Sequence, residues 1–172
     1  MKRFCPIDRD TKMIVNSIIE KDFKYLLGAN IAILFDSKKS KKSGRYIPGK
    51  FKKTNDIERY LSTEYLNEYE NPSHGYDYLM LIDENIFEKI DQKDKIRLIR
   101  HLLEFADIDY EADNPYKIRD PEVSTWFKEL EFNKDDPTWY QRIEGVAESI
   151  YDSEIQETKE PNDIVKDMSN NL

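Results

Sequence analysis

Apolar residues recur every three or four positions in several parts of the chain and form short uninterrupted runs in two others. The first pattern is typical of helices that bury one face, and the second of strands in a sheet. Helices are predicted from a cap at Asp8 or Asp10 to about Leu27, at 92–106, at 122–131 and at 137–151, with a short helical turn at 84–90. Strands are predicted at 30–35, buried on both faces, and at 76–83, in the centre of the sheet.

The segment 44–53 mixes apolar side chains with Pro48 and Gly49. Proline is tolerated in a strand mainly at an edge, so this segment is predicted to be an edge strand or a hairpin. The structure of residues 54–75 stays open, because helical spacing of apolar residues is followed by loop-forming Asn-Pro and His-Gly steps. Residues 153–172 are acidic, polar and weakly periodic, which predicts a mobile tail.

This order of elements predicts an α+β protein, with a small mixed β-sheet packed against helices and additional helices toward the C-terminus. The length of 172 residues suits one domain, placed at residues 1–152. No segment approaches the ~18 apolar residues of a membrane span, and the N-terminus lacks the apolar run of a signal peptide. The single cysteine, Cys5, fits a reducing compartment, so we expect a cytoplasmic protein with no membrane partner.

The net charge of −8 argues against a general nucleic-acid binder. Residues 38–53 nevertheless hold eight basic residues and no acidic one. Two interpretations of this segment stay open, a solvated basic loop and a binding surface for phosphate groups or a partner.

One histidine, His101, lies on the helix predicted at 92–106. On a helical wheel it falls at the border of the apolar half, next to Phe105, with Arg97 and Glu104 on the more polar side. A histidine in that place is usually structural, so the helix by itself predicts no chemistry for His101.

The amino-acid sequences of three segments give further information about the fold and about His101. They are "ANIAILFDSKKSKKSGRYIPGKFKK", "YDYLMLIDENIFEKIDQKDKIRLIRHLLEF" and "KIRDPEVSTWF". In this order, over about residues 10–132, they resemble the phage metallopeptidases, a family of small zincin-like proteins. The resemblance implies a zincin-like version of the α+β fold.

The helix that matches 92–106 bears an H-E-x-x-H motif in this family, in which two histidines bind zinc and the glutamate deprotonates the metal-bound water. Here His101 matches the first histidine, Leu102 replaces the glutamate and Phe105 replaces the second histidine. A further ligand position of the family is occupied by Arg119, which cannot coordinate a cation. The motif is therefore degenerate, and we expect no catalytic residue, no metal and no cofactor, with Leu102 and Phe105 packed under the former cleft.

An alternative keeps a metal, with zinc as the cofactor of an active peptidase or hydrolase that has a non-standard site around His101. Its ligands would be His101, Glu104 and Asp120, because Glu104 follows His101 at i+3 and Asp120 matches an aspartate of the family. His74 is the other histidine of the chain.

The leading hypothesis is a catalytically inactive metallopeptidase-like protein that acts as a binding or regulatory module. In zincins the edge strand beside the cleft pairs with an extended peptide, so a peptide or protein partner is expected at the segment 44–53. The predicted binding residues are Arg45, Lys50, Lys52 and Lys53. The second alternative is a nucleic-acid-associated protein that uses the basic segment Lys38–Lys53.

Overall fold

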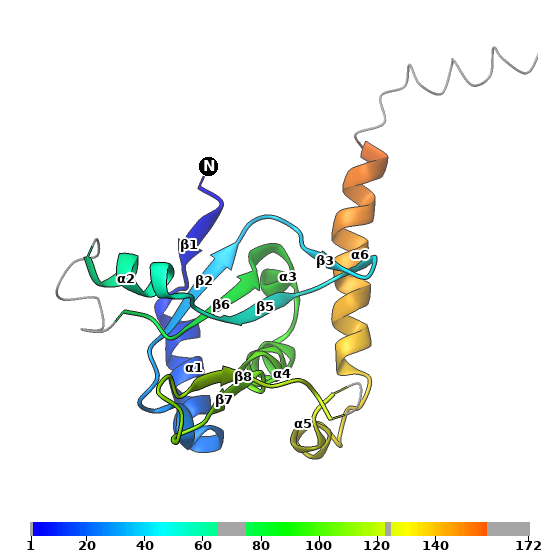
Figure 1. Ribbon diagram of the computed structural model, residues 1–172. Coiled ribbons are helices and arrows are strands. Elements are labelled where there is room, and N and C mark those ends of the chain that lie inside the picture. The colour runs from blue at the N-terminus through cyan, green and yellow to red at the C-terminus, as the bar shows by residue number, and fades with distance from the viewer. Residues whose placement is uncertain (1, 65–74, 123–124, 158–172) are drawn as a thin grey trace, which may run out of the picture.

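The computed structural model describes residues 2–64, 75–122 and 125–157 (Figure 1). Its strands are β1 (Phe4–Pro6), β2 (Ile31–Asp36), β3 (Lys41–Lys42), β4 (Arg45–Tyr46), β5 (Gly49–Lys53), β6 (Tyr78–Asp83), β7 (Ala106–Ile108) and β8 (Tyr116–Ile118). Its helices are α1 (Arg9–Asp22), α2 (Asp56–Glu64), α3 (Glu84–Lys89), α4 (Gln92–Leu103), α5 (Phe127–Phe132) and α6 (Trp139–Glu157), with a 3-10 turn η1 (Lys24–Leu26). The predicted α+β class, with a small mixed sheet and helices, is confirmed.

The main sheet has the strand order β1-β2-β6-β5. β2 and β6 are parallel, whereas β1 pairs with β2 and β5 pairs with β6 in antiparallel fashion. The prediction for residues 44–53 is confirmed in both of its forms, because β4 pairs with β3 in a hairpin and β5 then forms the edge of the sheet. The central position predicted for the strand at 76–83 is also confirmed.

One face of this sheet is covered by helices α1 and α4 (Figure 1). On the central strand, Tyr78, Met80 and Ile82 are fully buried, while the alternating Leu79 and Leu81 are only half-buried. Because side chains alternate across a strand, the two sets lie on opposite faces, and one of these faces is open. The expectation that residues 30–35 are buried on both faces was therefore wrong, since most of β2 is half-buried.

Helices α1 and α4 are shorter than predicted. α1 is capped by Asp8, whose side chain accepts a hydrogen bond from the Thr11 backbone, but it ends at Asp22 and not at Leu27, because Phe23 leaves the helical conformation. α4 ends at Leu103, since Ala106 already pairs with Ile118 in the hairpin β7–β8. The predicted acidic loop after α4 therefore contains two short strands.

The C-terminal helices also begin and end elsewhere. α5 starts at Phe127, several residues after the start predicted at 122, and residues 123–124 lie outside the described residues. Trp126, Phe127 and Leu130 are the apolar residues predicted to be buried here. Trp126 is buried as predicted, but Phe127 and Leu130 are exposed, and Glu129 is buried between them. α6 continues to Glu157, past the boundary of the predicted domain, and the rest of the predicted tail lies outside the described residues.

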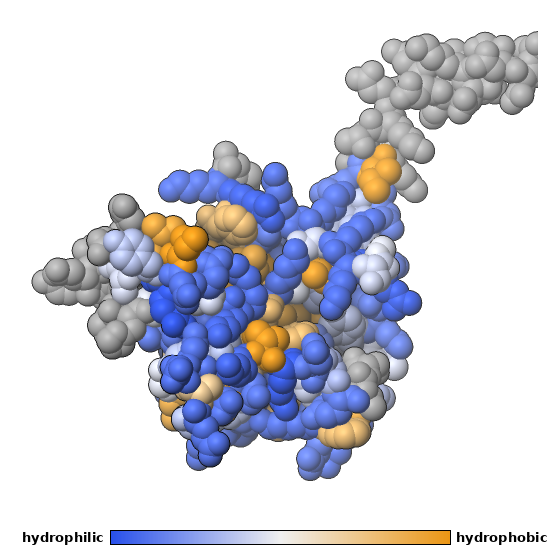
Figure 2. All heavy atoms as spheres, viewed as in Figure 1, coloured by the Kyte–Doolittle hydropathy of each residue, from blue (hydrophilic) through white to orange (hydrophobic). Residues whose placement is uncertain are grey.

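The first part of the segment left open, 54–75, forms helix α2, and 65–74 lie outside the described residues. α2 exposes Ile57 and Leu61, and Figure 2 shows hydrophobic side chains over this helix on an otherwise mainly hydrophilic face. Gly75 holds α2 close, since a Cβ there would lie 2.2 Å from the carbonyl oxygen of Arg59. None of the helices in the described ranges combines the length and apolar character needed to cross a bilayer.

Candidate functional site

The three positions that carry metal ligands in the resemblance lie together in the fold. His101 is in the last turn of α4, and Phe105 lies just beyond the end of that helix, with 5.8 Å between the two ring centroids. Arg119, directly after β8, donates its backbone N–H to the carbonyl oxygen of Phe105 at 3.0 Å. The hairpin β7–β8 therefore brings Arg119 back to the C-terminal end of α4.

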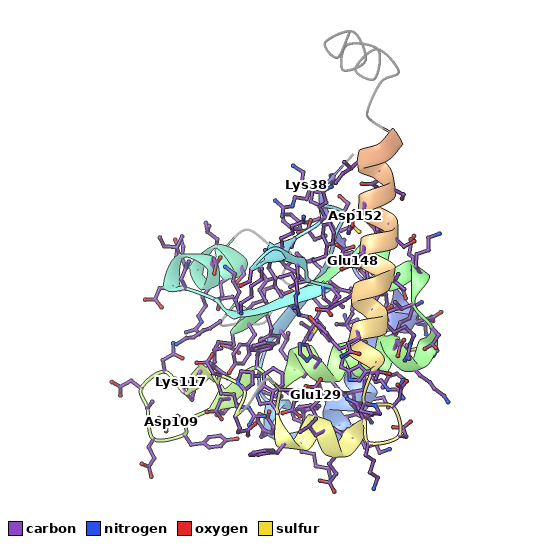
Figure 3. All side chains as sticks on the ribbon, turned by 90° about the vertical axis from the view of Figure 1, so that its right-hand side faces the viewer. Lys38, Asp109, Lys117, Glu129, Glu148 and Asp152 are labelled. Atoms are coloured by element: carbon purple, nitrogen blue, oxygen red, sulfur yellow. The ribbon has the colours of Figure 1, made fainter. Side chains whose placement is uncertain are left out.

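His101 has a carboxylate partner that the sequence did not indicate. Its Nδ1 atom lies 2.8 Å from Oε1 of Glu129, which is on α5 near the foot of α6 (Figure 3). Glu129 is 3% exposed, and its other carboxylate oxygen accepts a hydrogen bond from the hydroxyl of Thr125. A buried carboxylate bonded on both oxygens fixes the orientation of the imidazole.

Aromatic rings pack around the same imidazole. The centroids of Trp126, Tyr140 and Trp139 lie 5.2, 5.1 and 5.9 Å from that of His101. Phe105 in turn packs edge-on against Trp126 at 4.5 Å. Burial raises the pKa of Tyr140 to about 12. The region where a second histidine would complete a zinc site is therefore a packed aromatic cluster, which we call the His101 cluster: His101, Phe105, Trp126, Trp139 and Tyr140.

Leu102, at the position of the general base, points in a different direction from His101. It is 2% exposed and packs beneath the edge strand, since a Cβ added to Gly49 would lie 2.8 Å from its Cδ1 atom. The close approach of β5 to the Leu102 side chain of α4 therefore depends on the absence of a Cβ at position 49.

Glu104 and Asp120, the alternative metal ligands, do not converge on His101. Glu104 is fully buried and forms ion pairs with Arg119 and, at 3.8 Å, with Lys128. Burial raises the pKa of Glu104, whereas the positive charges of Lys128 and Arg119 act against this rise. Asp120 is exposed. Within the described ranges, no group of three or more His, Cys, Asp or Glu side chains is placed to hold a metal ion.

The edge strand β5 offers unused backbone groups. Pro48 accepts a hydrogen bond from Asp83 N–H, and Thr54 N–H donates to Asp77, so both ends of the strand bond toward β6. In an antiparallel pair, such residues alternate with residues whose N–H and C=O point away. Positions 50 and 52 therefore also bond toward β6, and Gly49, Phe51 and Lys53 direct their backbone groups to the outer edge, where no described residue bonds them.

The predicted binding residues divide into two groups. Lys50 and Lys52 are exposed on β5, and Lys53 is half-buried at its end. Arg45 is also exposed but belongs to the separate hairpin β3–β4. Lys52 forms an ion pair with Glu58 of α2. The structure thus brings Lys50, Lys52 and Lys53 to one edge and places Arg45 elsewhere.

Comparisons with known proteins agree with the resemblance seen in the sequence. The model of the family described as "Putative phage metallopeptidase" matches residues 5–151, a longer span than the segments at 10–132. Searches of curated proteins and of solved structures found no match. The mixed sheet and six helices of the described residues are consistent with a small zincin-like metallopeptidase fold. The chain therefore belongs to the putative phage metallopeptidase family.

Proposed function

We propose that this chain is a catalytically inactive metallopeptidase-like protein that binds an extended segment of a partner protein along β5. The side chains at the motif positions and the outward backbone groups of β5 support this proposal. Membership in the family by itself does not specify activity, so the proposal rests on the residues of this chain.

The side chains at the motif positions are engaged in packing and pairing. Leu102 provides no group that could deprotonate a water molecule, and its alkyl side chain is used against Gly49. His101 is held by Glu129, and Arg119 is held by Glu104. A zinc hydrolase of the H-E-x-x-H type would need a general base and further metal ligands at these places.

The observation that carries the binding proposal is the row of outward backbone groups on Gly49, Phe51 and Lys53. An extended peptide can add to such an edge by main-chain hydrogen bonds. Each bond contributes about 1 kcal/mol net before the cost of association, so a short peptide would bind weakly.

A single substitution can block the edge without breaking the sheet. Lys53→Pro removes an N–H that points outward and leaves the hydrogen bonds to β6 in place. We expect a titration with short extended peptides, followed by NMR, to shift the signals of β5, and Lys53→Pro to abolish these shifts. Lys53→Ala is the matched control, because it loses the same side chain and keeps the N–H, and it should still bind. Binding that survives Lys53→Pro, or a peptide set that never shifts β5, would refute the proposal.

A further inference from the structure

The two faces of β5 differ in chemistry. Gly49 faces Leu102 of α4, and the ring of Phe51 packs on Tyr78, with 5.1 Å between centroids. Because side chains alternate along a strand, Lys50 and Lys52 lie on the opposite, open face of the sheet. A strand added to this edge would therefore meet charge on one face and apolar side chains on the other.

The positive charge on the open face extends beyond β5. Lys38 and Lys50 border the same small hollow of about 10 Å³, next to Asp36 and Asp83. In Figure 3, Lys38 lies at the end of the molecule where Asp152 of α6 is found.

The two aspartates of this hollow already have partners. Arg3 binds both carboxylate oxygens of Asp36, at 2.9 and 2.8 Å, and holds the pKa of Asp36 below its usual value. The hydroxyl of Tyr151 donates to the carboxylate of Asp83, at 2.8 and 2.7 Å from its two oxygens. Neither Lys38 nor Lys50 forms an ion pair with any residue in the described ranges. Both ammonium groups therefore lack a close ion-pair partner in these ranges, although the charge of Lys50 acts on Asp36 at longer range.

We infer that the segment bound along β5 carries acidic side chains at two positions two residues apart, with an apolar residue between them. The acidic side chains would face Lys50 and Lys52, because cross-strand neighbours lie on the same face of a sheet. The residue between them would lie beside Phe51, on the face that carries Tyr78 and Leu102. This inference rests on the proposed strand addition and gives it a ligand class.

Lys50 is expected to contribute more than Lys52. Glu58 already compensates the charge of Lys52, and a ligand carboxylate must compete with it. Lys50 has no such close ion pair and interacts with Asp36 only at longer range, so a ligand carboxylate there has less to displace and also approaches Lys38. The acidic side chain of the ligand that faces Lys50 should therefore contribute more to affinity than the one that faces Lys52.

Four acetylated and amidated peptides test the inference: Thr-Glu-Val-Glu-Thr, its glutamine and lysine analogues, and Thr-Val-Glu-Glu-Thr, in which the acids are adjacent. We expect the alternating acidic peptide to bind about fivefold more tightly than the glutamine peptide, as two exposed ion pairs allow. The lysine peptide and the adjacent-acid peptide should bind more weakly than the alternating acidic peptide. Lys50→Glu should remove the preference for glutamate, and the exposed control Lys93→Glu should leave it unchanged.

The outcomes separate the two proposals. Equal binding of all four peptides, abolished by Lys53→Pro, would overturn the acidic pattern and leave strand addition intact. Failure of every peptide to bind would overturn both. Tighter binding of a single-stranded oligonucleotide than of the acidic peptide, lost in Lys50→Glu, would overturn the peptide ligand in favour of nucleic acid.

Discussion

The imidazole of His101 is bonded through Nδ1 to Oε1 of Glu129 at 2.8 Å, across 28 positions of sequence. This pair joins α4 to α5 beneath Trp126 and Trp139, the two tryptophans of the chain. Since both indoles contact His101, tryptophan fluorescence reports on this one cluster. Changes around the His101–Glu129 pair can therefore be measured directly by tryptophan fluorescence.

Glu129→Ala should destabilise the fold by about 2 kcal/mol, because the variant leaves the His101 nitrogen and the Thr125 hydroxyl without their partner in a largely buried place. Glu129→Gln keeps an acceptor for His101 and should cost less. Urea unfolding followed by tryptophan emission measures both values. The exposed Glu148→Ala serves as the control and should change stability little. Equal stability of the wild type and Glu129→Ala would contradict the structural role of the pair.

Gly49→Ala tests the contact between the edge strand and α4. The added Cβ would lie 2.8 Å from both the Leu102 Cδ1 atom and the Leu81 carbonyl oxygen. We expect a loss of about 1–3 kcal/mol, as for other overpacked positions. In Gly49→Ala with Leu102→Ala, part of the cost should be recovered relative to the sum of the single changes, which a double-mutant cycle in urea measures.

Gly145→Ala is the matched control for that experiment. Gly145 lies within α6, and an added Cβ meets no atom within 4 Å. Alanine is the better helix former, so this variant should gain about 0.5–1 kcal/mol. If both glycines responded alike, close packing at Gly49 would not be the cause of its effect.

The burial and the arginine partners of Asp94 predict how the stability of the fold depends on pH. It is 2% exposed and accepts hydrogen bonds from Arg97 and Arg142. Burial favours its protonated form, but these two guanidinium groups outweigh burial and lower the pKa of Asp94 in the folded state. The Asp94 carboxylate therefore binds a proton less readily in the folded protein than in the unfolded chain. Its ionised form stabilises the fold above the pKa of about 3.9 that aspartate has in the unfolded chain. This stabilisation is lost as the pH falls through the lower pKa of Asp94 in the folded protein.

Asp94→Asn should therefore cost about 2 kcal/mol at pH 7, since two charged hydrogen bonds to a buried carboxylate are lost while Arg97 and Arg142 keep the more exposed Asp136 as a partner. The difference from the wild type should shrink as the pH falls from 5 toward 3. Urea midpoints of both proteins across this range measure it. A difference that stays constant at all pH values would contradict the assignment to Asp94.

The sequence predicted the strands at 30–35 and 76–83 because each is a short apolar run with clear polar boundaries. It also predicted the edge strand, because Pro48 and Gly49 restrict where that segment can lie in a sheet. These signals are local. The end of α4 was not predicted, since it is set by the pairing of Ala106 with Ile118, which is distant in sequence.

The candidate site also combines features that local sequence indicates with features that depend on distant residues. The assignment of a degenerate motif to His101, Leu102 and Phe105 comes from the family resemblance and stays a prediction. Glu129 could not be predicted, because nothing in its local sequence indicates a histidine partner. Arg97 and Glu104 were placed on the polar side of the helix, and both are buried. Arg97 pairs with Asp135 and Asp136, and Glu104 with Arg119, so their burial depends on partners that the helical period does not show.

Metal content distinguishes an inactive scaffold from an unusual enzyme. Protein purified without a histidine tag should contain far less than one zinc per chain, because Glu129 and Arg119 already engage His101 and Glu104. The ligand positions nevertheless lie together, so Phe105→His with Arg119→His should gain zinc binding, since two further imidazoles would join His101. Elemental analysis after dialysis measures both proteins. Stoichiometric zinc in the wild type would refute the proposed inactivity, whereas zinc in the double variant without peptidase activity would show that Leu102 removes the base from a site whose geometry persists.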